Sequence, residues 1–235
     1  MNEKYLKIKK LFDLAFQSHK KNNLLHAENL YKEILEINPN DVATLNNLGN
    51  VLRESRKYEE AIFHYEKALM IKPQDIITNY NLGFLFKELK KFQKSISFYE
   101  KVVKIDPKHI QSHHDLMDIY EKTNNYEKLK KVIVDAKTFF KNNPIIKLYE
   151  GSLLYKNEKL NEAINNLESF LFDANKIKQE RFRVSTLGKC YDRTKNVDKA
   201  FDCFIKANDL SFQLKSKNIN KNFYLEEIEN KFEFF

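Results

Sequence analysis

Residues 42–75 read VATLNNLGNVLRESRKYEEAIFHYEKALMIKPQD, and residues 76–109 read IITNYNLGFLFKELKKFQKSISFYEKVVKIDPKH. The two segments are each 34 residues long and align without a gap, so that Gly49 matches Gly83. Self-similarity at a fixed period of about 20–50 residues indicates a repeat architecture, and the period seen here is typical of stacked helical hairpins. The two segments therefore predict an array of paired helices.

The residues that interrupt helices follow the same period along the chain. The prolines are separated by steps of 34, 34 and 37 residues and the glycines by steps of 34, 68 and 37, with Met117 at the skipped position. The prolines are Pro39, Pro73, Pro107 and Pro144, and the glycines are Gly49, Gly83, Gly151 and Gly188. Because proline and glycine mark turns and close approaches of the backbone, the turns themselves must recur.

Within residues 42–75, apolar residues recur at steps of three and four, as in amphipathic helices. The first stripe is Leu45, Leu48 and Leu52, and the second is Ala61, Tyr65 and Ala68. Small residues at the eighth and twentieth positions let the two helices approach closely, and the closing proline can start the next helix. In these residues the chain resembles the tetratricopeptide repeat (TPR) family, over residues 8 to about 213. The resemblance is strongest in residues 42–109.

The resemblance implies an all-α fold, a right-handed α-solenoid of about six TPR helix–turn–helix units with a C-terminal capping helix. The solenoid would cover residues 1–213, with repeats at 8–41, 42–75, 76–109, 110–143, 144–177 and 181–213. Residues 214–235 would form the capping helix or a linker to a missing domain. Asn79 replaces a bulky family residue, so we expect its helix pair to be less well anchored. Three extra residues near 173–178 predict a longer loop.

Composition limits the functional classes. The net charge is +8, mainly from lysine, which favours acidic partners, although scattered lysines are typical of solvated helix faces. Nucleic-acid binding through this excess is an alternative that we do not favour, because the lysines are dispersed.

Cys190 and Cys203 have no metal-site spacing and are expected to be reduced and buried, as in a cytoplasmic protein. Neither a signal peptide nor a membrane span is expected.

No catalytic signature is recognisable. The repeat uses all four glycines, so no phosphate-binding loop can be formed, and no GxSxG or HExxH motif occurs. One cluster could ligate a metal, although capping and solvation are the simpler interpretation of an exposed helix start. The cluster is His109, His113, His114, Asp115 and Asp118. We therefore expect a non-enzymatic protein without a cofactor or a metal.

In the TPR family the first helix of each repeat lines a concave groove. Carried onto this chain, the resemblance implies a peptide-binding groove formed by Phe12, Phe16, Asn46, Asn47, Asn50, Arg53, Tyr80, Asn81, Phe84 and Lys87. We therefore expect a protein–protein interaction scaffold that binds an extended peptide or a partner helix in this groove. Asparagine amides both donate and accept hydrogen bonds, so they can pair with the main chain of an extended peptide. The aromatic residues could anchor apolar side chains, although Phe12 and Phe16 could equally pack between neighbouring units.

Two further expectations concern partners. The TPR class that grips a terminal carboxylate uses basic residues, and the matching positions here read Asn46, Asn50, Asn81, Gln111 and Asp115, so we expect no such clamp. Tyr191-Asp192, Ala200-Phe201, Ala207-Asn208 and residues 224–235 are similar to the junction with the catalytic domain in bacterial TPR–sulfotransferase proteins. The alternative function is therefore substrate recruitment for a transferase domain absent from this chain. Self-association through the C-terminal end is also possible.

Overall fold

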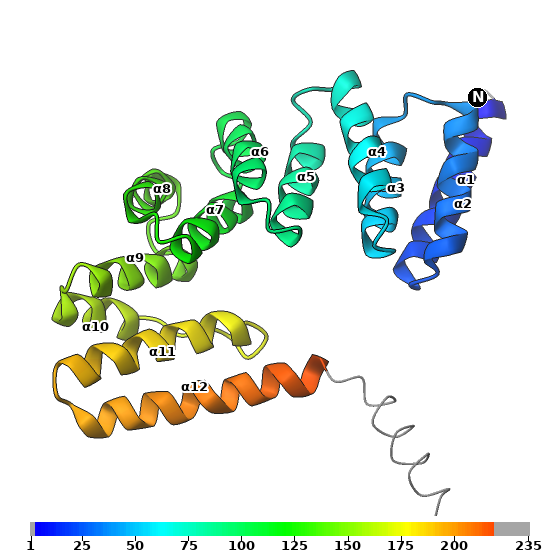
Figure 1. The fold of residues 1–235 in the computed structure, drawn as a ribbon. Helices are drawn as coiled ribbons and strands as arrows, with labels where there is room; N and C mark the ends of the chain where they lie inside the picture. Colours follow the sequence, from blue (N-terminus) through cyan, green and yellow to red (C-terminus); the bar gives the residue numbers. More distant parts are fainter. Residues whose placement is uncertain (1–2, 219–235) are drawn as a thin grey trace, which may run out of the picture. The chain divides into compact units, whose positions relative to one another are not determined.

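The computed structural model describes residues 3–218, which form twelve α-helices and no strand (Figure 1). The helices are α1 (Glu3–Lys20), α2 (Leu24–Ile37), α3 (Val42–Glu54), α4 (Tyr58–Ile71), α5 (Ile76–Glu88), α6 (Phe92–Ile105), α7 (Ile110–Lys122), α8 (Tyr126–Phe139), α9 (Pro144–Lys156), α10 (Leu160–Glu168), α11 (Ile177–Arg193) and α12 (Val197–Asn218). The chain divides within α7 into two units, residues 1–119 and residues 120–235. The all-α prediction is confirmed.

In the first unit, successive helices pair as antiparallel hairpins: α1 with α2, α3 with α4, and α5 with α6 (Figure 1). The repeated glycine explains how closely the two helices pack. A Cβ atom added to Gly49 would lie 2.5 Å from Cε1 of Tyr65, and one added to Gly83 would lie 2.8 Å from Cδ1 of Tyr99. Both tyrosines are fully buried. In these two repeats the glycine and the tyrosine therefore pack as one unit.

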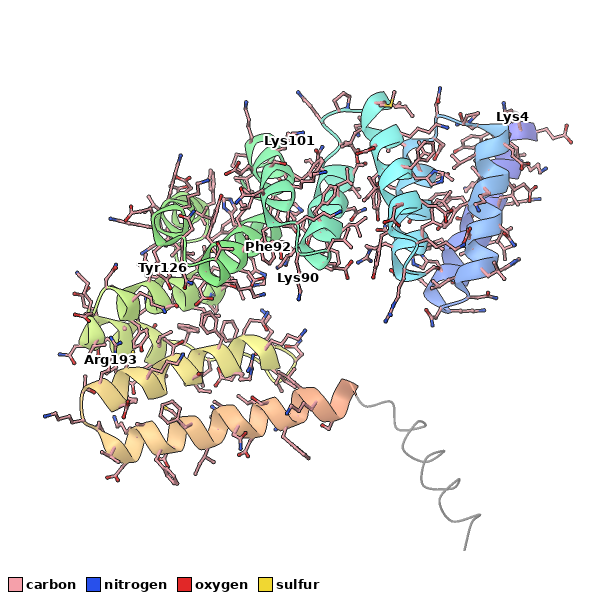
Figure 2. The ribbon with its side chains drawn as sticks, in the orientation of Figure 1. Lys4, Lys90, Phe92, Lys101, Tyr126 and Arg193 are labelled. Atoms are coloured by element: carbon pink, nitrogen blue, oxygen red, sulfur yellow. The ribbon has the colours of Figure 1, made fainter. Side chains whose placement is uncertain are left out.

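The turn inside each hairpin contains a residue with positive φ, and the sequence did not reveal it. Within residues 3–218, six such residues have φ between 55° and 61°, at steps of 34, 34, 34, 34 and 37: Asn22, Arg56, Lys90, Asn124, Glu158 and Lys195. At Lys90 (labelled in Figure 2), the Lys90 N–H donates to the Lys87 carbonyl at 3.0 Å and the Lys91 N–H donates to the Phe86 carbonyl at 2.8 Å. This pair of bonds is the Schellman motif, which usually has glycine at this position.

The turns between hairpins are fixed by side chains that bond to the backbone. Asp75 caps α5 by accepting from the Thr78 N–H at 3.0 Å. Asn79 is fully buried, and its Nδ2 donates to the carbonyls of Pro73 at 3.1 Å and of Asp75 at 2.9 Å. Hydrogen bonds therefore hold the Asn79 side chain against the preceding turn, and the weaker anchoring of this helix pair stays a prediction.

One repeat later, His113 takes the place of Asn79. It is buried, and its Nε2 lies 2.9 Å from the carbonyl of Pro107, which is also six residues upstream. The same position of two consecutive repeats therefore uses a polar side chain to hold the preceding turn.

In the second unit, the predicted longer loop is present. Eight residues connect α10 and α11, whereas four connect α4 to α5 and α8 to α9. α11 begins at Ile177 rather than at 181, and this extra turn contains the buried Glu180. Glu180 accepts from Arg183 Nη2 at 2.7 Å, from Arg183 Nε at 2.8 Å and from Lys206 Nζ at 2.8 Å, and Arg183 Nη1 donates to the Leu167 carbonyl at 2.8 Å. The ion pair thus joins α10, α11 and α12.

At the C-terminal end, α12 continues to Asn218, past the predicted repeat boundary at 213. The other residues of the expected capping helix, 219–235, lie outside the described residues. Val197, Phe201 and Phe212 of α12 are 63–73% exposed, and self-association through this end stays a prediction. Both cysteines are free, Cys190 buried and Cys203 half-buried. Within residues 3–218, none of the helices has the length and hydropathy needed to cross a membrane.

Candidate peptide-binding groove

The first unit contains a half-open hollow between α3 and the start of α5, which we call the α3–α5 hollow. Its volume is about 390 Å³. Its lining residues are Val42, Ala43, Asn46, Asn47, Asn50, Lys72, Asp75 and Ile77. Three of the four asparagines of the predicted groove therefore line one concave surface. The side chain of Ile77 is 63% exposed there, and Lys72 is paired with Asp75 at 2.8 Å.

Asn46 is used inside the protein rather than offered to a ligand. It is only 5% exposed, and its Nδ2 donates to Thr78 Oγ1 at 2.5 Å. Its Oδ1 accepts from Asn81 Nδ2 at 3.5 Å. The side chains of Asn46 and Asn81 therefore connect α3 to α5. The expectation that the Asn46 amide binds a peptide main chain does not fit this geometry.

Asn47 and Asn50 differ from Asn46, because each is half-buried and keeps one polar atom without a partner among the described residues. Asn47 Nδ2 donates to the Ala43 carbonyl at 2.8 Å, which leaves its Oδ1 as an acceptor. Asn50 Oδ1 accepts from the Tyr65 hydroxyl at 2.7 Å, which leaves its Nδ2 as a donor. Burial raises the pKa of Tyr65 well above its ordinary value, so the hydroxyl stays protonated and donates. The hollow thus offers one acceptor and one donor.

The groove residues also form a ladder between successive repeats. Among the described residues, hydrogen bonds join side chains that are 35 positions apart, that is, one repeat plus one position. They are Asn46–Asn81 at 3.5 Å, Tyr80–Asp115 at 3.1 Å, His19–Glu54 at 2.9 Å and Arg53–Glu88 at 3.3 Å. Each bond links the first helix of one repeat to the first helix of the next. Several residues predicted to bind a partner therefore also fix the spacing of the groove.

The aromatic residues of the predicted groove have different surroundings. Phe84 is half-buried, and the guanidinium of Arg53 lies 4.8 Å from the centre of its ring. Tyr80 lies beside Tyr99, with ring centres 5.6 Å apart. Phe12 packs edge-on against Tyr31 of its own hairpin, with ring centres 5.8 Å apart, so it belongs to the core of the first repeat.

Phe16, by contrast, is 39% exposed, with Lys20 Nζ 4.6 Å from its ring centre. Packing thus accounts for Phe12 but not for Phe16. Of the four aromatic residues predicted as anchors, Phe16 is the one that the structure describes as exposed.

Lys87 is enclosed by carboxylates. Its Nζ lies 2.7 Å from Asp115 Oδ1 and 2.6 Å from Asp118 Oδ2, and the side chain is 19% exposed. Burial alone would lower the pKa of Lys87, but the two carboxylates outweigh burial and hold the pKa above its ordinary value. The ammonium is therefore charged and committed to internal partners. Lys87 supports the groove wall instead of presenting a cation to a ligand.

The alternative of a metal site gains no support from the geometry. His109 Nδ1 lies 2.9 Å from Ser112 Oγ, and His114 Nδ1 lies 3.0 Å from Gln111 Nε2. The imidazole of His113 is directed at the Pro107 carbonyl, and Asp115 contacts Lys87. Within residues 3–218, no group of three His, Cys, Asp or Glu side chains could hold a metal ion.

Sequence reasoning missed Asp75 and Thr78, which hold Asn46 in place. A signal for Asp75 was present, because Asp41 and Asp75 are 34 residues apart and both cap the first helix of a repeat. The contact between Asn46 and Thr78 has no such signal, because it joins different repeats.

Comparison with known proteins identifies the repeats. Residues 42–75 and 77–109 each match a family model of the tetratricopeptide repeat. The solved structure of Pseudomonas aeruginosa pilF superimposes on this chain with a TM-score of 0.67 and 15% sequence identity. The match covers 97% of this chain and 100% of the pilF chain. YrrB, described as a TPR protein with an unusual peptide-binding site, is 19% identical, covers 80% of this chain and 98% of its own, and gives a TM-score of 0.58.

No curated protein matches the chain in sequence. The chain therefore carries tetratricopeptide repeats on the all-α TPR fold, as predicted. The resemblance to the TPR region of sulfotransferase proteins stays a prediction.

Proposed function

We propose that this chain is a non-catalytic scaffold that holds an extended peptide of a partner protein in the groove along α3 and α5. The observation that carries the proposal is the α3–α5 hollow, where Asn47 and Asn50 keep an acceptor and a donor beside the exposed Ile77. The TPR repeats and the structural similarity to YrrB, a protein with a peptide-binding site, support the same function.

The geometry favours an extended peptide over a partner helix. An extended chain leaves its N–H and C=O groups unpaired, whereas a helix satisfies them internally. Asn47 and Asn50 are three residues apart on α3, which places them about one helical turn apart on the same face. One can accept from a peptide N–H and the other can donate to a nearby peptide carbonyl. Because both bonds go to the main chain, they restrict the peptide sequence little.

Specificity then depends on the apolar contacts. Ile77 borders the hollow and offers an exposed aliphatic surface. Phe84 lies two turns further along α5, with Arg53 over its ring. A peptide that follows α5 would meet both. We propose a cytoplasmic location and no cofactor for this activity.

Selection from a library of linear 12-residue peptides tests the proposal, with affinities of the selected peptides measured by fluorescence anisotropy on the full chain. Asn47→Ala/Asn50→Ala removes both spare groups. Two net hydrogen bonds are worth about 2 kcal/mol, so we expect a loss of affinity of about 30-fold. The matched control is Asn161→Ala/Asn165→Ala, which removes two exposed asparagines from α10 and should leave the affinity unchanged. Equal binding by both double variants would refute the assignment.

A further inference from the structure

The charge of the groove is opposite to the charge of the chain. The chain carries +8, and α1 alone has five lysines against two carboxylates. Yet α3, α5 and residues 110–119 of α7 together contain two cations and four carboxylates. The cations are Arg53 and Lys87, and the carboxylates are Glu54, Glu88, Asp115 and Asp118. The first helices of the second, third and fourth repeats therefore have a net charge of −2 within this unit.

The contacts show where the surplus negative charge lies. Lys87 is shared by Asp115 and Asp118, at 2.7 and 2.6 Å. Arg53 is shared by Glu54 at 3.2 Å and Glu88 at 3.3 Å. At the Arg53 cluster one guanidinium lies between two carboxylates, so with His19 counted as neutral this cluster has a net charge of about −1. The Arg53 cluster is the accessible one, because the side chains of Glu54 and Glu88 are 40% and 42% exposed, whereas that of Asp115 is 5% exposed.

The accessible carboxylates lie near the hollow. Asn50 and Glu54 are four residues apart on α3, so they share one face at an axial separation of about 6 Å. A lysine or arginine side chain of a peptide seated in the hollow can span that distance. The other charged or titratable groups beside Glu54 and Glu88 are Arg53 and His19, and His19 Nε2 lies 2.9 Å from Glu54. The remaining cation at the hollow, Lys72, is paired with Asp75.

We infer that the peptide held in this groove is basic, with a lysine or arginine that contacts Glu54 and Glu88. The inference rests on the proposed function and reverses the expectation from net charge, which favoured acidic partners. The cation adds to main-chain bonds at Asn47 and Asn50, so it sets the preference among peptides rather than the ability to bind one. Exposed charge pairs contribute modestly to affinity and are weakened by salt.

Three pools of fluorescein-labelled 11-residue peptides test the inference on the full chain. Eight positions are random mixtures of Ala, Ser and Leu, and the other three are all Lys, all Gln or all Glu. By anisotropy in 50 mM NaCl we expect the Lys pool to bind about tenfold more tightly than the Gln pool, and the Glu pool to bind most weakly. In 300 mM NaCl the preference should shrink.

Two double variants with the same change in charge show whether the preference for the Lys pool depends on contact with Glu54 and Glu88. Glu54→Gln/Glu88→Gln should weaken the Lys pool about three- to tenfold and leave the Gln pool unchanged. Glu59→Gln/Glu60→Gln makes the same charge change at exposed residues of α4 and should leave every pool unchanged. An equal loss in both variants would show long-range attraction instead of contact and would overturn the inference.

The outcomes separate the inference from the proposed function. If all three pools bind equally and Asn47→Ala/Asn50→Ala weakens them, peptide binding stands and the preference for basic peptides is refuted. If no pool binds at 1 mM protein, both are refuted.

Discussion

The non-glycine residues with positive φ give the most specific prediction about stability. Arg56 and Lys90 have φ of 61° and 57° at the ends of α3 and α5, and both side chains are exposed. The left-handed conformation costs an ordinary residue roughly 1–2 kcal/mol, which glycine avoids. Glycine in turn has more entropy to lose on folding, about 0.4–1 kcal/mol. Arg56→Gly/Lys90→Gly should therefore raise the free energy of unfolding by about 1–2 kcal/mol.

Urea unfolding followed by circular dichroism at 222 nm measures the effect. Two control variants separate backbone strain from the loss of a side chain. Lys90→Ala removes the same exposed side chain but keeps a Cβ atom at positive φ, so it should not stabilise. Asn22→Gly changes a residue that tolerates this conformation, so its effect should be close to zero. If the double glycine variant unfolds at the same urea concentration as Lys90→Ala, or at a lower one, the account of strain in these turns is wrong.

Three other predictions concern packing, the groove and pH. Gly49→Ala should destabilise the chain by about 1–3 kcal/mol in urea unfolding, because its Cβ would lie 2.5 Å from a buried Tyr65 atom, and a result within error of wild type would contradict this packing. Asn46→Ala should cost about 1–3 kcal/mol, because it leaves buried partners unsatisfied, whereas Asn47→Ala should cost less than about 0.5 kcal/mol; similar losses would refute the distinction between the two amides. Burial by itself would raise the pKa of Glu180. The hydrogen bonds and positive charges of Arg183 and Lys206 outweigh burial and lower this pKa from 4.5 to about 2. Its contribution to stability is therefore present above pH 4.5 and lost as the pH falls toward 2, and Glu180→Gln should flatten the decrease of stability in that window.

Much of the fold could be predicted, because its signals are local and repeated. The spacing of Gly49 and Gly83 marks the close approach of two helices, and the structure places a tyrosine ring against each. The left-handed turns could not be predicted in this way. Their residues are Asn, Arg, Lys, Asn, Glu and Lys, so only the backbone shows that they share one conformation.

The candidate site was predicted only in outline. The repeat position predicts that Asn46, Asn47 and Asn50 share one surface of α3, and all three line the α3–α5 hollow. The repeat position of a residue does not indicate which of these side-chain amides keeps a polar atom free to bind a ligand. Asn46 and Asn47 are identical and adjacent, but they point about 100° apart around the helix, so that Asn46 meets Thr78 and Asn47 does not. In the same way, the repeat position of Lys87 does not indicate that its ammonium forms ion pairs with Asp115 and Asp118 of the next repeat.

The sequence by itself therefore determined the type of the helices and the period at which they recur. Helix periodicity, caps and close contacts depend on residues a few positions apart, or on one residue repeated every 34 positions. Only the tertiary structure decided which polar side chains bind a neighbour and which face the groove. The reason is that those bonds join residues 28–35 apart in different repeats, and their partners vary from one repeat to the next although the helices that carry them do not.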